Sequence, residues 1–283
     1  MIKNLKKTIV SVCAFCLCLI FSGGISARAA AQVKYAEIPV LSDGIFITVG
    51  LKANNTIYVP IREFCLAIEP EALVLWEKDT GTATVRTDGL IIELCLKDSY
   101  MTANDRFLYF EDGIININGT AYVPLGEICL AFGIKPLQDA ELGAVVISTE
   151  NREYITSAED YYDSRDIFWL SRLINSEAGN QPIEGKIGVG NVVLNRVEDP
   201  ACPDTIFDVI FDCKYGVQFS VIATGAIYGA PNEESEIAAK ICLEGYNTVG
   251  GSIYFFNPRI SASNWITTYR TFVTGIGDHY FYF

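Results

Sequence analysis

One glutamate, Glu177, has the placement that proton transfer to a leaving oxygen requires. It follows Leu173 by four residues and Ile174 by three, and residues at these spacings share one face of a helix. A carboxylate on an apolar face is costly unless it is paired or protonated. Partial desolvation there favours the neutral acid, which can act as a general acid. The alternatives are that Glu177 reaches solvent at the helix end or pairs with Arg172 or Arg196.

Two predicted helices place this glutamate beside a loop. The first begins at Arg165 and is stopped by Gly179. Its apolar residues recur at three- and four-residue spacing: Ile167, Leu170, Leu173, Ile174 and Ala178. The second helix begins near Pro182, a good first-turn residue, and Gly188 and Gly190 let a neighbouring element approach closely. Glu177 therefore lies in the last turn of the first helix, where the chain opens into a loop.

Several motifs in this half of the chain carry a family resemblance. The chain contains LINSEA at residues 173–178 and EGKIGVGNVVLNRV at residues 184–197. Four shorter motifs follow in order: Thr205-Ile206 with Val209-Ile210, Gln218-Phe219-Ser220, IYFFNP at 253–258 and IGDHYF at 276–281. Together they resemble the signature of the SleB/CwlJ-type cell wall hydrolases, the spore-cortex-lytic and related wall enzymes, over nearly all of residues 166–283.

The resemblance implies a lysozyme-like α+β domain at residues 165–283 and a peptidoglycan glycosidase activity. The family's glutamate in its N-[AS]-E-A motif maps to Glu177, and the implied reaction is lytic transglycosylation between N-acetylmuramic acid and N-acetylglucosamine. This reaction needs one carboxylate, whereas most glycosidases use two. Asp208, Asp212 and Asp278 remain possible second acids, so hydrolysis of the muramidase type stays open.

Other residues in these motifs are candidates for binding the sugar chain. Gln218 and Ser220 offer an amide and a hydroxyl group, although a plain loop role is nearly as well supported. Trp265 can stack on a sugar ring, although a buried tryptophan is equally common. His279 follows an aromatic pattern that is more typical of a hydrogen-bonded structural residue than of a catalytic base.

The strand-like run at residues 252–257 places two further candidates. Alternation puts Tyr254 and Phe256 on one face and Phe255 and Asn257 on the other. One of these faces belongs to the core. We therefore expect Tyr254 and Asn257 as substrate-binding residues, with Tyr254 favoured.

The first half of the chain contains an internal repeat. Residues 56–67 (TIYVPIREFCLA) return as residues 120–131 (TAYVPLGEICLA). Each copy predicts a short strand that ends at proline and then a helix, and strand-like runs follow at 82–86, 90–96 and 144–148. We expect one β-rich domain at residues 33–150, joined by a polar, acidic linker at 151–164.

This repeat resembles the copper amine oxidase N-terminal-like (stalk) domain. The resemblance covers most of residues 40–150 and implies a non-catalytic spacer, attachment or interaction module, with a wall or protein partner. It does not imply copper, since the chain's only histidine is His279. One histidine and no close cysteine pair also make a zinc site unexpected, so no metal or cofactor is predicted.

The start of the chain is typical of a secretory signal peptide at residues 1–31. Lys3, Lys6 and Lys7 precede an apolar run at 8–21, and A-x-A patterns follow. A membrane anchor is the weaker alternative, because the run is shorter than the roughly 20 residues that span a bilayer. No later segment is long and apolar enough to span. We therefore expect secretion to the cell wall or spore envelope.

The charge and the cysteines limit the remaining possibilities. The chain has 21 basic and 34 acidic residues, so it lacks the basic surface of a nucleic-acid-binding protein. Cys65 and Cys129 lie in apolar runs and are expected in the core, whereas Cys202 and Cys213 are the most plausible disulfide pair.

Two other functions stay open. One is an N-acetylmuramoyl-L-alanine amidase, although such enzymes commonly use zinc. The other is a non-catalytic wall-binding protein. Peptidoglycan glycan strands are the expected partner in either case, and the sequence does not distinguish spore cortex from vegetative wall.

Overall fold

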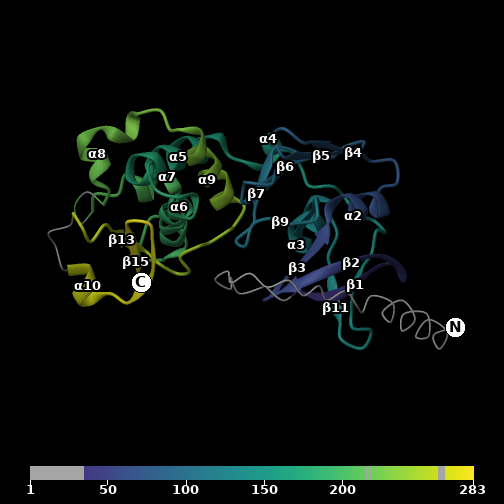
Figure 1. Ribbon diagram of the computed structural model, residues 1–283. Coiled ribbons are helices and arrows are strands. Elements are labelled where there is room, and N and C mark those ends of the chain that lie inside the picture. The colour runs from purple at the N-terminus through teal and green to yellow at the C-terminus, as the bar shows by residue number, and fades with distance from the viewer. Residues whose placement is uncertain (1–34, 215, 217, 261–264) are drawn as a thin grey trace, which may run out of the picture. The chain divides into compact units, whose positions relative to one another are not determined.

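The structure, a computed structural model, describes residues 35–283 apart from residues 215, 217 and 261–264 (Figure 1). The predicted signal peptide at residues 1–31 lies outside the described residues. Within the described ranges, no helix combines the length and the apolar character needed to cross a membrane. The described chain consists of β-rich and helical regions, so the predicted α+β class is confirmed.

The first region is built on a sheet of strand order β11-β12-β1-β2-β3-β10-β9. Its strands are β1 (Ala36–Ser42), β2 (Ile45–Ala53), β3 (Thr56–Pro60), β9 (Ile115–Ile117), β10 (Thr120–Pro124), β11 (Leu137–Asp139) and β12 (Ala144–Ile147). The pairing of β1 with β12 is parallel, and the other neighbouring strands are antiparallel.

The internal repeat forms two equivalent strand–helix units in this region. β3 leads into α2 (Ile61–Ile68) and β10 into α3 (Leu125–Ala131), so each helix begins directly after the proline, as predicted. The strands β3 and β10 pair with each other, and the paired residues are Tyr58 with Pro124, Val59 with Val123, and Pro60 with Tyr122. Because Val59 and Val123 are equivalent repeat positions, the two units are related by a local twofold axis.

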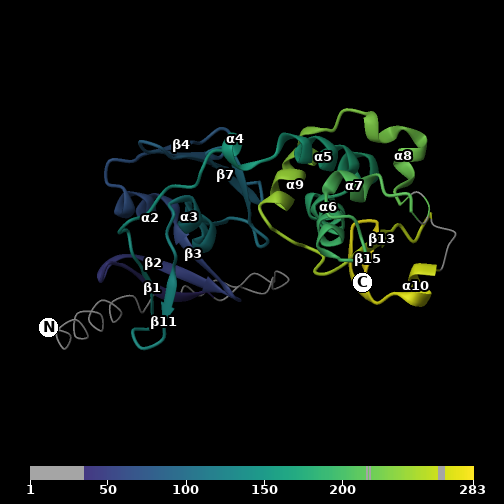
Figure 2. The same cartoon turned by 180° about the vertical axis from the view of Figure 1, so that it is seen from behind.

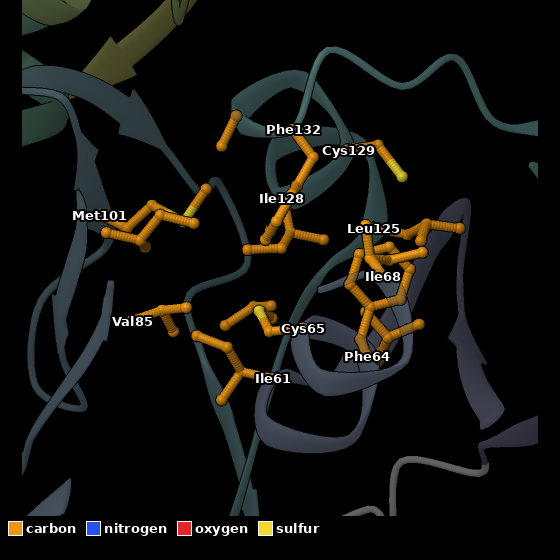
Figure 3. Packing of buried hydrophobic residues seen from close by; sticks show 14 of the residues in the cluster. Ile61, Phe64, Cys65, Ile68, Val85, Met101, Leu125, Ile128, Cys129 and Phe132 are labelled. Atoms are coloured by element: carbon orange, nitrogen blue, oxygen red, sulfur yellow. The ribbon is translucent and has the colours of Figure 1, made fainter. Parts of the chain in front are cut away.

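The repeat helices lie against a second sheet of strand order β4-β5-β6-β7-β8. Its strands are β4 (Leu73–Glu77), β5 (Thr82–Arg86), β6 (Ile91–Cys95), β7 (Tyr100–Ala103) and β8 (Arg106–Tyr109). Figure 3 shows Val85 and Met101 of this sheet directed toward Cys65 and Ile128 of the helices. Cys65 and Cys129 are fully buried free thiols, which confirms their prediction as small core residues.

The second region is built on three longer helices that pack against one another: α5 (Ser164–Ala178), α6 (Ile183–Glu198) and α9 (Glu233–Leu243) (Figure 2). Shorter elements surround them: α7 (Ile206–Ile210), α8 (Ser220–Thr224), η1 (Ala226–Tyr228) and α10 (Trp265–Tyr269). A small sheet of order β13-β15-β14 completes the region, with β13 (Tyr254–Phe256), β14 (Phe272–Ile276) and β15 (His279–Tyr282).

The glycines of α6 permit the close approach that the sequence predicts. A Cβ atom on Gly188 would lie 2.8 Å from the ring of Phe281 and 2.8 Å from Val249. One on Gly190 would lie 2.6 Å from the sulfur of Cys242 in α9. Both distances are shorter than real Cβ contacts, so side chains at these positions would force α6 away from α9 and β15.

The segment between the two regions makes buried contacts with both. Ile155 belongs to the core of the first region. After α4 (Ala158–Tyr161), the hydroxyl of Tyr162 donates a hydrogen bond to Glu244, at the end of α9. Arg106 of β8 donates to the same carboxylate from Nε and Nη2, at 2.9 and 2.7 Å. Residues 151–164, which the sequence predicts as a linker, thus contact both regions through Ile155 and Tyr162.

Cys202 and Cys213 do not form the disulfide that their spacing suggested. Both are free thiols in the structure, and Cys202 is half-buried whereas Cys213 is exposed. The suggested pairing is therefore wrong.

Candidate active site

Glu177 lies in the last turn of α5 with a partly buried side chain. Burial raises the pKa of its carboxyl from 4.5 to about 7, and among the described residues no charge or hydrogen bond contributes to this shift. The helix end acts in the same direction, because the free carbonyl groups there carry a partial negative charge that disfavours a carboxylate. Near neutral pH, Glu177 is therefore present as both acid and carboxylate.

Neither arginine that could have neutralised Glu177 does so. Arg172 donates to the carbonyl oxygen of Phe168 at 3.2 Å, and its guanidinium carbon lies 3.6 Å from the centre of the Phe168 ring. Arg196 is buried and donates from Nε to the carbonyl oxygen of Ile253 at 2.8 Å. The structure thus excludes the pairing that the sequence left open.

The turn that carries Glu177 is fixed to the N-terminus of α9. The Oδ1 atom of Asn175 accepts hydrogen bonds from the backbone N–H of Asn232, at 3.1 Å, and from the Ser235 hydroxyl, at 3.3 Å. The side chain of Asn232 in turn donates to the carbonyl oxygen of Gly179 at 3.3 Å. Residues two positions before and two after Glu177 are therefore held by the same helix end.

A second contact holds this turn from the side of η1. The hydroxyl of Ser176 lies within hydrogen-bond distance of the carbonyl oxygens of Arg172, at 2.7 Å, and Ala226, at 3.1 Å. Ser176 is thus tied to η1 and Asn175 to α9, while the Glu177 carboxyl itself has no partner in the described part of the chain.

The carboxylates that were considered as second acids are all engaged elsewhere. Asp208 accepts from the Thr205 hydroxyl at 2.6 Å and helps to cap α7. Asp212 accepts from the backbone N–H of Lys214 at 2.9 Å. Asp278 pairs with Arg259 at 2.9 Å. None of them shares the unpaired environment of Glu177.

Gln218 and Ser220 are both exposed, on either side of the buried Phe219. The Gln218 side chain is 3.5 Å from the carbonyl oxygen of Gly216, and Ser220 opens α8 without capping it. Their polar groups are therefore accessible to a ligand at the surface.

Tyr254 and Trp265 form one aromatic pair. Their ring centres are 5.6 Å apart and the rings meet edge to face. The Tyr254 hydroxyl accepts a hydrogen bond from Arg270 at 2.8 Å. The guanidinium of Arg196 lies 5.6 Å from the Tyr254 ring and 5.2 Å from the Phe219 ring. The structure thus brings Tyr254 and Trp265 close to the segment of Gln218 and Ser220.

Asn257 and His279 have more local roles in this part of the fold. The Oδ1 atom of Asn257 accepts from the backbone N–H of Arg259 at 2.9 Å, so this side chain shapes a turn. His279 is buried between Phe255 and Phe281, and its Nδ1 atom has no hydrogen-bond partner among the residues that the structure describes. Burial lowers the pKa of His279, which favours the neutral ring. The expected hydrogen-bonded histidine is thus held by aromatic packing instead.

The sequence motifs did not single out two residues that follow Glu177 closely in the chain, Gln181 and Lys186. Both are buried, and the Lys186 ammonium donates to the carbonyl oxygen of Gln181 at 2.7 Å. The signal was present: Lys186 precedes Val189 by three residues and Val193 by seven, so it lies on an apolar face of α6.

Comparisons with known proteins match two separate parts of the chain. A family model described as Cell Wall Hydrolase matches residues 180–282, and one described as Copper amine oxidase N-terminal domain matches residues 46–147. Residues 180–282 are therefore similar to the cell wall hydrolase family, and Glu177 lies three residues before the start of this match.

Relatives and a solved structure each match less than half of this chain. The Spore cortex-lytic enzyme of Halalkalibacterium halodurans is 34% identical over 46% of this chain and 38% of its own length. That of Bacillus cereus is 33% identical over 44% of this chain and 47% of its own length, so this chain spans less than half of either relative. The solved catalytic domain of the germination-specific lytic transglycosylase SleB from Bacillus anthracis is 34% identical, covers 43% of this chain and 97% of that domain, and has a TM-score of 0.40.

Proposed function

We propose that this protein is a peptidoglycan lytic transglycosylase that cleaves the bond between N-acetylmuramic acid and N-acetylglucosamine. The observation that carries the proposal is the unpaired, partly buried Glu177 with a pKa of about 7. The similarity of residues 180–282 to the cell wall hydrolase family supports the substrate class. The names of the relatives favour spore cortex as the source of that peptidoglycan.

In the proposed reaction Glu177 acts first as an acid. The neutral carboxyl donates its proton to the glycosidic oxygen while the bond from that oxygen to C1 of the muramic residue breaks. Positive charge develops at C1, in the manner of an oxocarbenium ion. The N-acetylglucosamine side leaves as an alcohol, and Glu177 becomes a carboxylate.

Glu177 then acts as a base. Its carboxylate accepts the proton of the muramic C6 hydroxyl while O6 bonds to C1, which closes a 1,6-anhydro ring and regenerates the neutral acid. No water is consumed and no second carboxylate is needed. A pKa near the working pH suits both steps, because acid and base forms are both accessible.

We propose that Gln218, Ser220, Tyr254, Asn257 and Trp265 contribute to binding of the glycan strand. The exposure of Gln218 and Ser220 supports this role. Trp265 is 46% exposed and is held edge to face by Tyr254, so it offers an ordered aromatic surface for a sugar ring. The side chain of Asn257 is engaged in its own turn and is the weakest member of the set.

We further propose that the protein is secreted through the signal peptide at residues 1–31 and acts in the cell wall or spore envelope. The first region then serves as a spacer, attachment or interaction module. Its closely packed repeat units and fully buried cysteines support a structural role rather than a catalytic one.

Mass spectrometry of digested peptidoglycan tests the proposed reaction. Residues 32–283, the Glu177→Gln variant and a matched Glu198→Gln control on the exposed end of α6 would each be incubated with vegetative wall and with spore cortex. We expect anhydromuramic ends from the parent and the control and none from Glu177→Gln. Reducing muramic ends would change the reaction to hydrolysis, and released peptides would indicate an amidase.

A further inference from the structure

Lys186 is a buried charge that the proposed reaction does not use. It is 1% exposed on α6, and its ammonium donates to the carbonyl oxygen of Gln181 at 2.7 Å. The same ammonium pairs with Glu234 in the first turn of α9, whose side chain is 53% exposed. The ammonium therefore joins the connection between α5 and α6 to the start of α9.

The residue that Lys186 holds is itself tightly placed. Gln181 is 7% exposed, and its Oε1 atom accepts from the backbone N–H of Asp278 at 2.8 Å. Its side-chain amide lies 3.3 Å from Oδ2 of Asp278. A Cβ atom on Gly277, which has a φ of 58°, would lie 2.3 Å from Gln181 Oε1, so this contact requires glycine. Gln181 thereby links the connection after α5 to the turn between β14 and β15.

These contacts hold the chain that follows Glu177, as those of Asn175 hold the chain that precedes it. The α9 end holds Asn175 and Gly179, and Lys186 holds Gln181, four residues after the glutamate. A loose connection would let this turn move toward water. Fixed connections of this kind matter because small displacements of a catalytic group reduce rates strongly.

We propose that Lys186 is a positioning residue, which keeps Glu177 in its partly desolvated place by fastening Gln181 in the α5–α6 connection to the start of α9. The inference rests on the proposed function. Lys186 acts through the Gln181 carbonyl, and nothing in the structure brings its ammonium to the Glu177 carboxyl.

Packing alone does not account for a lysine at this position. Removing one partner of an ion pair is strongly destabilising when the other charge stays buried. Here the other charge, Glu234, is 53% exposed and can be hydrated, so a methionine that fills the same space on α6 is expected to lower the stability only modestly. What it lacks is the ability to donate to the Gln181 carbonyl and to bind Glu234.

The test compares Lys186→Met with Glu177→Gln and with the matched control Lys240→Met, whose ammonium lies 4.9 Å from the Phe107 ring on the far side of α9. The rate of release of anhydromuramic ends, its kcat and KM, its pH profile and the melting temperature would be measured for each. We expect kcat of Lys186→Met to fall about 10-fold to 100-fold with KM nearly unchanged.

The pH profile separates positioning from stability. A hydrated Glu177 ionises at lower pH, so the alkaline limb of kcat should move to lower pH in Lys186→Met, whereas a loss of stability alone lowers the folded fraction without moving the limb. Other charged groups around this turn are Arg172, Glu184, Arg196, Glu233, Glu234, Glu236, Lys240, Arg259 and Asp278, with His279, and among them Glu234 loses its ion-pair partner on this substitution.

Two results for Lys186→Met would overturn the positioning role. One is parental activity. The other is a parental pH profile together with a rate that falls only as far as the folded fraction of the variant falls. Should Lys186→Met fail to fold, Glu234→Gln decides the question, since it weakens the same fastening from an exposed partner. We expect it to shift the limb in the same direction, by less. An active Glu177→Gln would instead overturn the proposed function.

Discussion

Each of the two regions of this protein contains a partly buried glutamate, but only one of the two carboxyls has a hydrogen-bond partner in the described part of the chain. Glu127 of the first region lies in the first turn of α3, where the helix dipole favours a negative charge, and it bonds to Tyr246. Glu177 of the second region lies in the last turn of α5, without a partner among the described residues. Burial raises the pKa of both carboxyls, but only Glu177 is left without a compensating hydrogen bond. The comparison teaches that a buried carboxylate is available for chemistry when its surroundings leave it unpaired.

The largest expected effect is that of Glu177→Gln, with Glu127→Gln as its counterpart in the first region. Glu177→Gln should lower the rate of anhydromuramic release about 1000-fold, because the proton donor is lost. Glu127→Gln should keep nearly the parental rate, since its carboxyl is used in packing. Mass-spectrometric quantification of anhydromuramic ends under identical conditions measures both. Equal losses in the two variants would break the comparison.

A buried charge that is fully paired should behave differently from Glu177. Arg106→Met removes the cation that donates twice to Glu244 and leaves that carboxylate buried. We expect the free energy of unfolding to fall by about 3 kcal/mol, as for other broken buried pairs. Urea unfolding measures the change, with the exposed Arg62→Met as the control. Similar losses in both variants would argue against a structural role for the Arg106 pair.

The raised pKa of Glu177 also predicts a stability effect with a defined sign. Below the unfolded value of 4.5 both states are protonated; between 4.5 and about 7 the unfolded state ionises first, which destabilises the fold. Glu177→Gln removes this penalty. Its gain in free energy of unfolding over the parent should therefore be larger at pH 8 than at pH 4, by on the order of 1–3 kcal/mol. A gain independent of pH would contradict the raised pKa.

Trp265→Ala should have the smallest effect. Losing one exposed aromatic contact to a sugar ring is expected to raise KM about fivefold, corresponding to about 1 kcal/mol, and to leave kcat nearly unchanged. Phe46→Ala, at an exposed aromatic residue of the first region, is the control. Steady-state kinetics on soluble glycan fragments measure both. A fall in kcat alone would place Trp265 outside the binding surface.

Local patterns predict much of this fold. The proline that ends each repeat strand, the glycines of α6 and the apolar spacing of α5 all act over a few residues, and the structure confirms each of them. The placement of Glu177 on the apolar face follows from the same spacing.

Contacts between distant residues could not be predicted in this way. The sequence alone does not show that Lys186 would meet Glu234, or that Gln181 would meet Asp278. It also suggested the pair Cys202 and Cys213, whereas both are free thiols in the structure. Such contacts depend on how elements pack, which no short-range pattern records.

The most direct test of the account is a titration of the glutamate carboxyl carbons by NMR, on the parent and on Glu177→Gln. We predict one carboxyl that titrates near pH 7 in the parent and is missing from the variant. If the resonance assigned to Glu177 titrated near its ordinary value of 4.5, the glutamate would be hydrated or paired, and its assignment as the general acid would be contradicted.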